Sequence, residues 1–273
     1  MTSITSPALY LMQSMTGDNA ATDLFSIISG QNTGAASTDP ATALTLAEKN
    51  ETQEVKRQAS DPETSRNVKH FLAVVAKATD LKAIMNDPIA RDVLLTANGL
   101  GDQSDYTALA TKALMSDPSK PGNFASTLSD PRWLATAKTY NFATQGLAQL
   151  KAPGILATVT NGYAEVKWRE SLDTGTPGLS AALDFRSRAN TIKTVDQILG
   201  DSNLRKVVTT ALGIPQQIAF QSLEAQEKAI SSKIDITKFK DPKFVEQFAR
   251  RFLLANQPDP STSGSTSALS LLA

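Results

Sequence analysis

Apolar residues recur at helical spacing through the middle of the chain. Val68, Phe71, Leu72 and Val75 stand at positions i, i+3, i+4 and i+7, which places them on one face of an α-helix. Asp-Pro pairs occur between the apolar stretches and mark where helices begin. An aspartate accepts hydrogen bonds from the free N–H groups of the first turn, and a proline in that turn loses no backbone hydrogen bond. Helix starts are predicted from such pairs at 61–62, 87–88, 130–131 and 241–242. Ser60 and Glu63, on either side of the first pair, also have the spacing of a capping box.

The pattern occurs twice. Residues 71–100 align without a gap on residues 185–214, with eight identities in 30 positions at a shift of 114. Residues 130–133 then match 241–244 at a shift of 111. Self-similarity at a fixed spacing predicts repeated copies of one structural unit. The paired positions are packing and capping residues, and Gly99 and Gly213 are expected to end a helix in each copy.

The sequence therefore predicts an all-α fold, a multi-helix bundle built from two related helical repeats with flexible polar termini. We expect each repeat to bury its apolar stripes against the other. The tails are rich in Ser, Thr, Ala and Gly, which bury too little apolar surface to offset the entropy of ordering. The expected order is a low-complexity, largely disordered tail over 1–57, a first repeat over 58–145, a connector over 146–180, a second repeat over 181–255 and a flexible tail over 256–273.

The connector permits two interpretations. Asn161-Gly162 between apolar residues is typical of a type I′ hairpin turn. Against this, Ile155, Val159, Tyr163 and Val166 recur at spacings of 4, 4 and 3 residues, which favours a helix. We predict one helix over 154–172, with the hairpin as the alternative.

Composition narrows the function classes. The 273 residues include 27 basic and 27 acidic ones, so there is no net charge to attract nucleic acid. No stretch approaches the roughly 20 apolar residues that span a bilayer, so membrane insertion is not expected. The absence of cysteine excludes disulfides and thiolate sites. The first basic residue is Lys49, so no secretory signal is predicted and the chain is expected to be made in the cytoplasm.

Reactive residues are sparse. His70 is the one histidine, so a histidine metal cluster is impossible and any Ser-His-Asp triad would have to use it. We expect His70 to be a partly exposed residue on a helix. No Gly-x-Ser-x-Gly elbow and no phosphate-binding glycine loop occur. The sequence thus predicts no catalytic residue, no cofactor-binding residue and no metal ligand.

Three weaker patterns have two interpretations each. Glu165 and Glu170 could form the acid pair of a glycoside hydrolase, although helix-surface charges are the usual explanation. Trp133 and Trp168 are predicted in the core rather than in a ligand-stacking site. A basic stretch could suggest nucleic-acid contact through interleaved phenylalanines, but acidic residues interrupt it, so we expect core phenylalanines and solvated lysines. Its members are Lys228, Lys233, Lys238, Phe239, Lys240, Lys243, Phe244, Arg250 and Arg251.

Several segments resemble the bacterial family called domain of unknown function 1217, often found with flagellar genes. The resemblance covers about residues 66 to 255. Its motifs are Asp87-Pro88-Ile89-Ala90-Arg91-Asp92-Val93-Leu94-Leu95-Thr96-Ala97-Asn98-Gly99-Leu100, Asn123 to Trp133, Tyr140-Asn141-Phe142, Ala182 to Arg186, Thr209 to Gly213 and Phe248 to Phe252. Trp133 stands where the family usually has a tyrosine, a change that preserves packing. The resemblance implies a mostly helical, flagellum-associated protein and carries no catalytic residue or cofactor to this chain.

The leading hypothesis is a non-enzymatic, flagellum-associated structural or interaction protein that binds other proteins, with flagellar components as the expected partners. It would bind through a groove between the two repeats or through its ends. One alternative is a cytoplasmic flagellar regulator or export chaperone. Another is a cell-wall-cleaving hydrolase that uses Glu165 and Glu170. Export to the flagellum without a cleaved signal, retention in the cytoplasm, and the oligomeric state stay open.

Overall fold

The computed structural model describes residues 39–257, and the predicted all-α class is confirmed, because no strand occurs in this range. The expected tails over 1–38 and 258–273 lie outside the described residues. The helices are α3 (Pro40–Ala59), α4 (Pro62–Lys77), α5 (Leu81–Asn86), α6 (Pro88–Ala97), η1 (Gly101–Gln103), α7 (Thr107–Leu114), α8 (Phe124–Thr127), α9 (Pro131–Tyr140), α10 (Phe142–Gln145), α11 (Pro153–Leu172), α12 (Leu179–Arg188), η2 (Ala189–Thr191), α13 (Val195–Gly200), α14 (Ser202–Ala211), η3 (Gln216–Phe220), α15 (Leu223–Ser231), η4 (Ile236–Lys240) and α16 (Pro242–Ala255).

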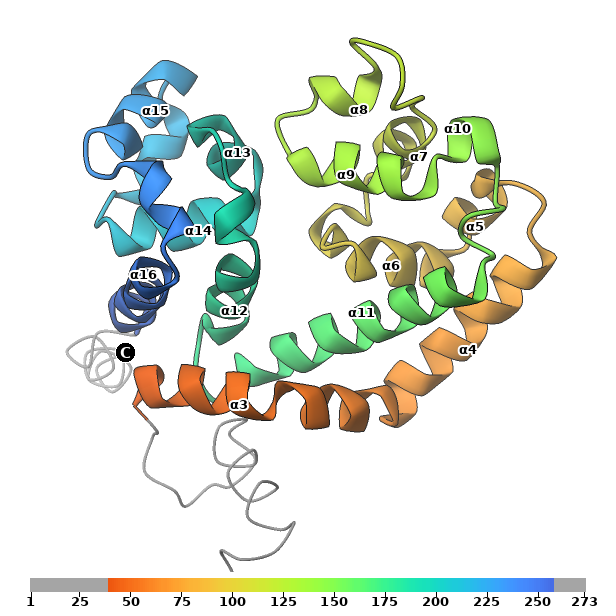
Figure 1. Cartoon of the computed structure of the whole chain (residues 1–273), viewed down its shortest axis with the longest axis horizontal. Helices are drawn as coiled ribbons and strands as arrows, with labels where there is room; N and C mark the ends of the chain where they lie inside the picture. Colours follow the sequence, from red (N-terminus) through yellow and green to blue (C-terminus); the bar gives the residue numbers. More distant parts are fainter. Residues whose placement is uncertain (1–38, 258–273) are drawn as a thin grey trace, which may run out of the picture.

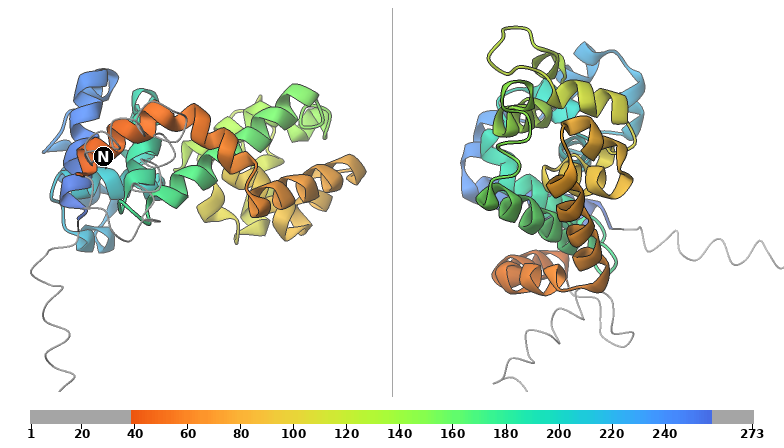
Figure 2. Two further views of the ribbon diagram at one scale, coloured as in Figure 1. Left: turned by 90° about the horizontal axis from the view of Figure 1, so that it is seen from below. Right: turned by 90° about the vertical axis from the view of Figure 1, so that its right-hand side faces the viewer.

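Two groups of short helices stand on a base of longer ones (Figure 1). The base consists of α3, α4 and α11, and α11 runs beneath the first group toward the second. We call α4 to α10 the first half and α12 to α16 the second half. The view from below shows α3 crossing from one half toward the other (Figure 2). The two halves therefore share a common floor and face each other above it.

Each half has its own hydrophobic core. The first core includes Phe71 and Trp133, and the second includes Phe185 and Phe239. The expectation that each half buries its apolar stripes against the other is wrong. Both halves pack against helix α11 instead, which contributes Tyr163 to the first core and Trp168 to the second. The predicted burial of both tryptophans and of Phe239 is confirmed.

The prediction of a largely disordered tail over 1–57 is wrong for residues 40–57. Residues 40–57 lie in α3, whose first turn is capped by Asp39, with Thr42 N–H donating to its carboxylate at 3.1 Å. Ala43, Leu44 and Ala47 are buried in the second core. The composition of this segment is typical of disorder, but a few small apolar residues on one helix face are enough for a helix to form when a core lies beside them.

The connector forms a helix, as predicted: α11 spans Pro153–Leu172. The alternative hairpin is excluded. Gly162 has a packing role there, since a Cβ at this position would lie 3.0 Å from the carbonyl oxygen of Ala97. The missing side chain lets α11 approach α6 closely.

Local rules place the helix starts as expected, with one correction. The carboxylates of Asp87, Asp130 and Asp241 each accept an N–H of the helix that follows. At the start of α4, however, the cap is Asp61 rather than Ser60, because its carboxylate accepts both Glu63 N–H and Thr64 N–H at 3.0 Å. A carboxylate at the last position before the helix outcompetes the predicted capping box.

Two pairs of helices begin and end at matching positions in the two halves. Helices α5 and α13 both have six residues, and α6 and α14 both have ten, each pair being offset by 114 residues in the sequence. Gly99 and Gly213 both take the left-handed conformation, with φ of 73° and 61°. These angles explain why glycine follows each helix.

Candidate protein-interaction site

An ion cluster joins the two halves above α11. Arg132, at the start of α9, places its Nε 3.1 Å from Oδ2 of Asp201, which caps α14. Arg188 of α12 contacts the same oxygen through Nη1 at 2.7 Å, and Asp130 pairs with Arg132 at 2.7 Å. The side chain of Asp201 is 0% exposed and that of Arg132 is 8% exposed. Buried charges of this kind persist only when they are paired.

The cluster determines the charge state of Asp201. Burial by itself raises the pKa of its carboxyl, but the guanidinium groups of Arg132 and Arg188 more than offset this, together with the Leu204 N–H. The net pKa therefore lies below its usual range. Asp201 is accordingly a carboxylate at neutral pH and attracts both arginines.

Close backbone contact surrounds this cluster. A Cβ on Gly200 would lie 2.6 Å from both the carbonyl carbon and the oxygen of Ser129, so only glycine allows α13 to approach the loop before α9. The Ser202 hydroxyl donates to Asp102 Oδ2 at 2.7 Å, and Arg132 also donates to the Gly99 carbonyl. The halves thus meet through a small polar contact that is tightly packed.

A cleft of about 390 Å³ lies below this contact. Its walls come from α6 and η1 of the first half, from α11, and from α12 and α14 of the second half. Charges of both signs line it, including Asp92, Asp102, Lys167, Glu170 and Asp184. Lys167 pairs with Glu170 at 2.9 Å, so the cleft neutralises part of its own charge.

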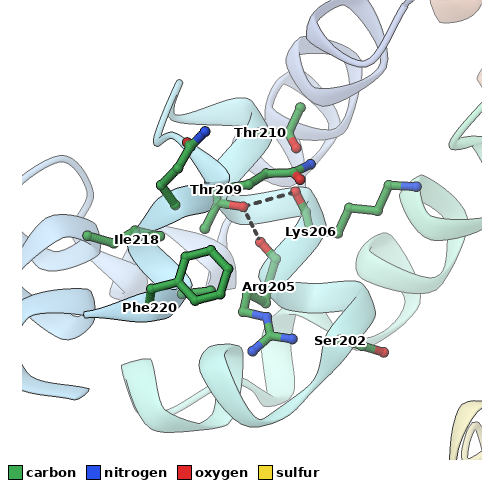
Figure 3. A pocket seen from close by; sticks show the side chains of 10 residues that line it. Ser202, Arg205, Lys206, Thr209, Thr210, Ile218 and Phe220 are labelled. Atoms are coloured by element: carbon green, nitrogen blue, oxygen red, sulfur yellow. Dashed lines mark hydrogen bonds between the residues drawn. The ribbon is translucent and has the colours of Figure 1, made fainter. Parts of the chain in front are cut away.

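A larger groove of about 470 Å³ opens on the second half, between α14 and η3 (Figure 3). Phe220 of η3 lines it and is 92% exposed. Arg205 and Lys206 of α14 are exposed beside it, and within residues 39–257 neither side chain has an ion-pair partner. An exposed aromatic ring next to two exposed cations is a combination typical of an interaction surface.

Three residues that line the groove are equivalent, in the repeated sequence, to three residues that line the cleft. Lys206, Thr210 and Gln216 of the groove stand 114 residues after Asp92, Thr96 and Asp102 of the cleft. In the first half this wall is covered by α11 and by the second half. In the second half the residues that line the corresponding groove come from α14 and η3 alone.

The reactive residues considered from sequence do not converge on one place. His70 lies on α4 with its side chain 42% exposed, as expected, and its Nε2 is 2.8 Å from Asp87 Oδ2. Glu165 pairs with Arg169 and Glu170 with Lys167, and these two carboxylates are 38% and 53% exposed. Among residues 39–257, no three His, Cys, Asp or Glu side chains are grouped so that they could hold a metal ion.

The basic stretch of the second half is divided between core and surface. Phe239 is buried, and Phe244 is partly buried against the same core. The ammonium group of Lys238 lies 5.8 Å from the ring centroid of Phe244. Across the part of the chain that the structure describes, no helix is long and apolar enough to cross a bilayer.

Sequence inspection missed Arg132, Asp201 and Phe220 as site residues. A usable signal lay in the differences between the two copies rather than in their identities. Asp102, which forms part of the contact in the first half, is replaced by Gln216 in the second copy. Such unequal positions are candidates for a role that only one half performs.

The fold is that of an all-α protein with two helical halves, each with its own core. The chain belongs to the family described as "Protein of unknown function (DUF1217)", whose profile matches residues 97–245. A crystal structure of protein AGR_C_984 from Agrobacterium tumefaciens is similar, with a TM-score of 0.66 and 24% identity over 81% of this chain and 95% of that one. That likeness shows the fold. Among curated proteins, none matches the chain significantly.

Proposed function

We propose that this chain is a non-enzymatic protein-binding component associated with the bacterial flagellum. The observation that carries the proposal is the groove in which Phe220 is 92% exposed beside Arg205 and Lys206, two exposed cations that form no ion pair with any described residue. The partner segment would place an apolar side chain on Phe220 and carboxylates near the two cations. Aromatic residues and arginine supply most of the binding energy at protein interfaces.

The flagellar association rests on the family resemblance. The all-α scaffold supports a binding role because its buried carboxylates, Asp130 and Asp201, are held in helix caps and ion pairs. Matching helix lengths at one offset support the further hypothesis that the halves arose by internal duplication. An experimental structure in which α5–α6 and α13–α14 fail to superpose would contradict that hypothesis.

The groove is tested with Phe220→Ala in the full chain. Tyr106→Ala is a matched control, because Tyr106 stands 114 residues earlier and is also exposed, at 59%. Each tagged protein is incubated with isolated flagella and flagellar basal structures. We expect Phe220→Ala to reduce retention at least tenfold, which corresponds to about 1.4 kcal/mol, and Tyr106→Ala to leave it unchanged. Absence of retention of the unaltered chain, with normal motility after gene deletion, would contradict the proposal.

Location is tested separately. The protein is assayed in culture medium, in sheared filaments and in the cytoplasm. Recovery in filaments supports an exported structural protein. Recovery in the cytoplasm alone supports the alternative, a regulator or export chaperone that acts on flagellar proteins before they leave the cell.

A further inference from the structure

Four residues of the basic stretch line a single hollow on the second half, which we call the basic hollow. Lys233 follows α15, Lys238 lies in η4, and Phe244 and Arg251 lie on α16. The basic hollow has a volume of about 420 Å³, which is within the range of pockets that bind ligands. It shares no lining residue with the groove at Phe220, so the two are separate sites.

The floor of the basic hollow is apolar. Leu212, Ile234 and Phe248 line it and belong to the second core, where they are 7%, 9% and 4% exposed. The ring of Phe244 is partly buried against the same core, with its centroid 5.9 Å from that of Phe248. An apolar side chain of a ligand would therefore leave water when it enters the hollow, which favours binding.

The rim of the basic hollow is cationic. Lys233, Lys238 and Arg251 are exposed, and none of them forms an ion pair with any residue that the structure describes. By contrast, Arg250, the neighbour of Arg251 on α16, pairs with Glu246 at 2.7 Å. The three cations of the rim are therefore accessible to a ligand with negative charge.

One carboxylate, that of Asp235, also lines the rim. It accepts the Thr237 N–H at 2.9 Å and the Thr237 hydroxyl at 2.7 Å, and so caps η4. Three cations and one carboxylate leave a net charge of +2, which attracts an anionic ligand. The attraction is strongest at Lys238 and Arg251, because the carbonyl end of α15 partly offsets the charge of Lys233.

We propose that the basic hollow binds an acidic peptide segment of a partner protein, with one apolar side chain on the floor and flanking carboxylates at Lys238 and Arg251. Charge complementarity of this kind steers association and fixes the register of the bound segment. Gln247, which is exposed and lines the hollow, can donate to and accept from the backbone of the peptide. The inference goes beyond the proposed function, because it concerns a second site.

A peptide fits the basic hollow better than a nucleic acid does. Proteins that bind single strands stack the bases on exposed aromatic rings. Phe239 is buried and Phe248 is 4% exposed, so neither ring can stack on a base. Asp235 on the rim would also repel a phosphate backbone. An isolated carboxylate side chain of a peptide can avoid Asp235, whereas a continuous row of phosphates cannot.

Short synthetic peptides test the inference on the full chain. Each peptide has a central Leu, Phe or Ser with two Glu or two Lys on either side, and fluorescence polarisation of an attached dye reports binding. We expect the Glu-flanked peptides with Leu or Phe to bind, and to bind more weakly as salt screens the exposed charges. The Ser-centred and Lys-flanked peptides should bind about tenfold more weakly. No binding of any Glu-flanked peptide up to about 1 mM, or equal binding of Ser-centred and Leu-centred peptides, overturns the inference.

Charge reversal in the protein locates the binding site. Lys238→Glu and Arg251→Glu should each weaken binding of the Leu-centred acidic peptide about tenfold, and each should strengthen binding of the Lys-flanked peptide. Lys193→Glu is the matched control, because Lys193 is an exposed lysine of the second half that does not line the hollow. Circular dichroism checks that every variant keeps its helices. Equal binding by the unaltered chain and both hollow variants, or the same loss in Lys193→Glu, overturns the inference.

Two further measurements separate this ligand from others and this site from the groove. A single-stranded oligonucleotide of equal charge that binds more tightly than the acidic peptide would overturn the inference in favour of nucleic acid. Phe220→Ala should leave peptide binding unchanged, and a loss would assign the peptide to the groove instead. Flagellar retention that is unchanged in Phe220→Ala overturns the proposed function alone and leaves the peptide site of the basic hollow standing.

Discussion

The two halves begin a helix with the same short motif and use it differently. Asp130-Pro131-Arg132 in the first half and Asp241-Pro242-Lys243 in the second both cap a helix with the aspartate. Asp130 and Arg132 are buried at 6% and 7% exposure, whereas Asp241 and Lys243 are exposed. The motif determines where a helix begins, and the neighbouring half determines whether its charges become part of an interface.

The same lesson holds on the opposite side of the contact. Asp87 and Asp201 both cap a ten-residue helix. Asp87 keeps an exposed partner, His70, while Asp201 faces two arginines away from water. Capping is a local property that sequence reveals, and burial is a tertiary property that it does not.

The largest expected difference concerns the two cations. Arg132→Ala leaves Asp201 and Asp130 buried without this partner, so we expect a loss of about 3 kcal/mol in the free energy of unfolding. Arg188 stays beside Asp201 and limits the loss. Lys243→Ala should change stability by less than about 0.5 kcal/mol, because its side chain is exposed. Urea unfolding measures both, and equal effects would refute the contrast between the halves.

The next difference concerns close packing. Gly200→Ala should cost about 1–3 kcal/mol, because its Cβ would meet the backbone of Ser129, which cannot rotate away as a side chain could. Asn86→Ala, at the corresponding exposed position, should be nearly neutral. Thermal unfolding of the two variants compares them. A stable Gly200→Ala protein would mean that α13 and the loop before α9 can separate freely.

The smallest expected difference concerns how the stability of the fold responds to low pH through Asp201 and Asp87. Asp201 and Asp87 both have a pKa below the usual value, and burial opposes the shift in each case. Arginines overcome it at Asp201, and the Ala90 N–H and His70 overcome it at Asp87. A lowered pKa contributes stability that is full above the unfolded value of about 3.9 and is lost as the pH falls through the folded value.

Asn substitutions isolate these contributions while preserving the caps. Asp201→Asn should flatten the loss of stability below about pH 3.9, where the unfolded carboxyl begins to bind protons. Asp87→Asn should flatten it less, because Asp87 is partly exposed and solvent screens its partner. Chemical unfolding across this pH range measures both slopes. A steeper effect at Asp87 would contradict the assignment.

Much of the fold could be predicted because its rules are local. Asp-Pro starts, glycine stops and apolar spacing located the helices, and the spacing of Ile155, Val159, Tyr163 and Val166 correctly favoured α11 over a hairpin. Helix α3 escaped prediction because its burial depends on a core built more than a hundred residues later in the chain.

The candidate site was harder to predict. Arg205 and Lys206 look like ordinary helix-surface cations, and Phe220 looks like a core residue. Nothing in local spacing says that η3 turns this ring outward, because its exposure depends on how the following segment packs. The cluster at Arg132 likewise joins residues that lie far apart in sequence.

Helix α11 sets the angle between the two cores. Tyr163 belongs to one core and Trp168 to the other, and the two residues are only five positions apart. A helix turns by about 100° and advances by about 1.5 Å with each residue. Inserting a single residue after Tyr163 would therefore rotate one core about the axis of α11 relative to the other core by about 100°. The two halves would then no longer be in contact, although the sequence of every capping motif and of both cores would be unchanged.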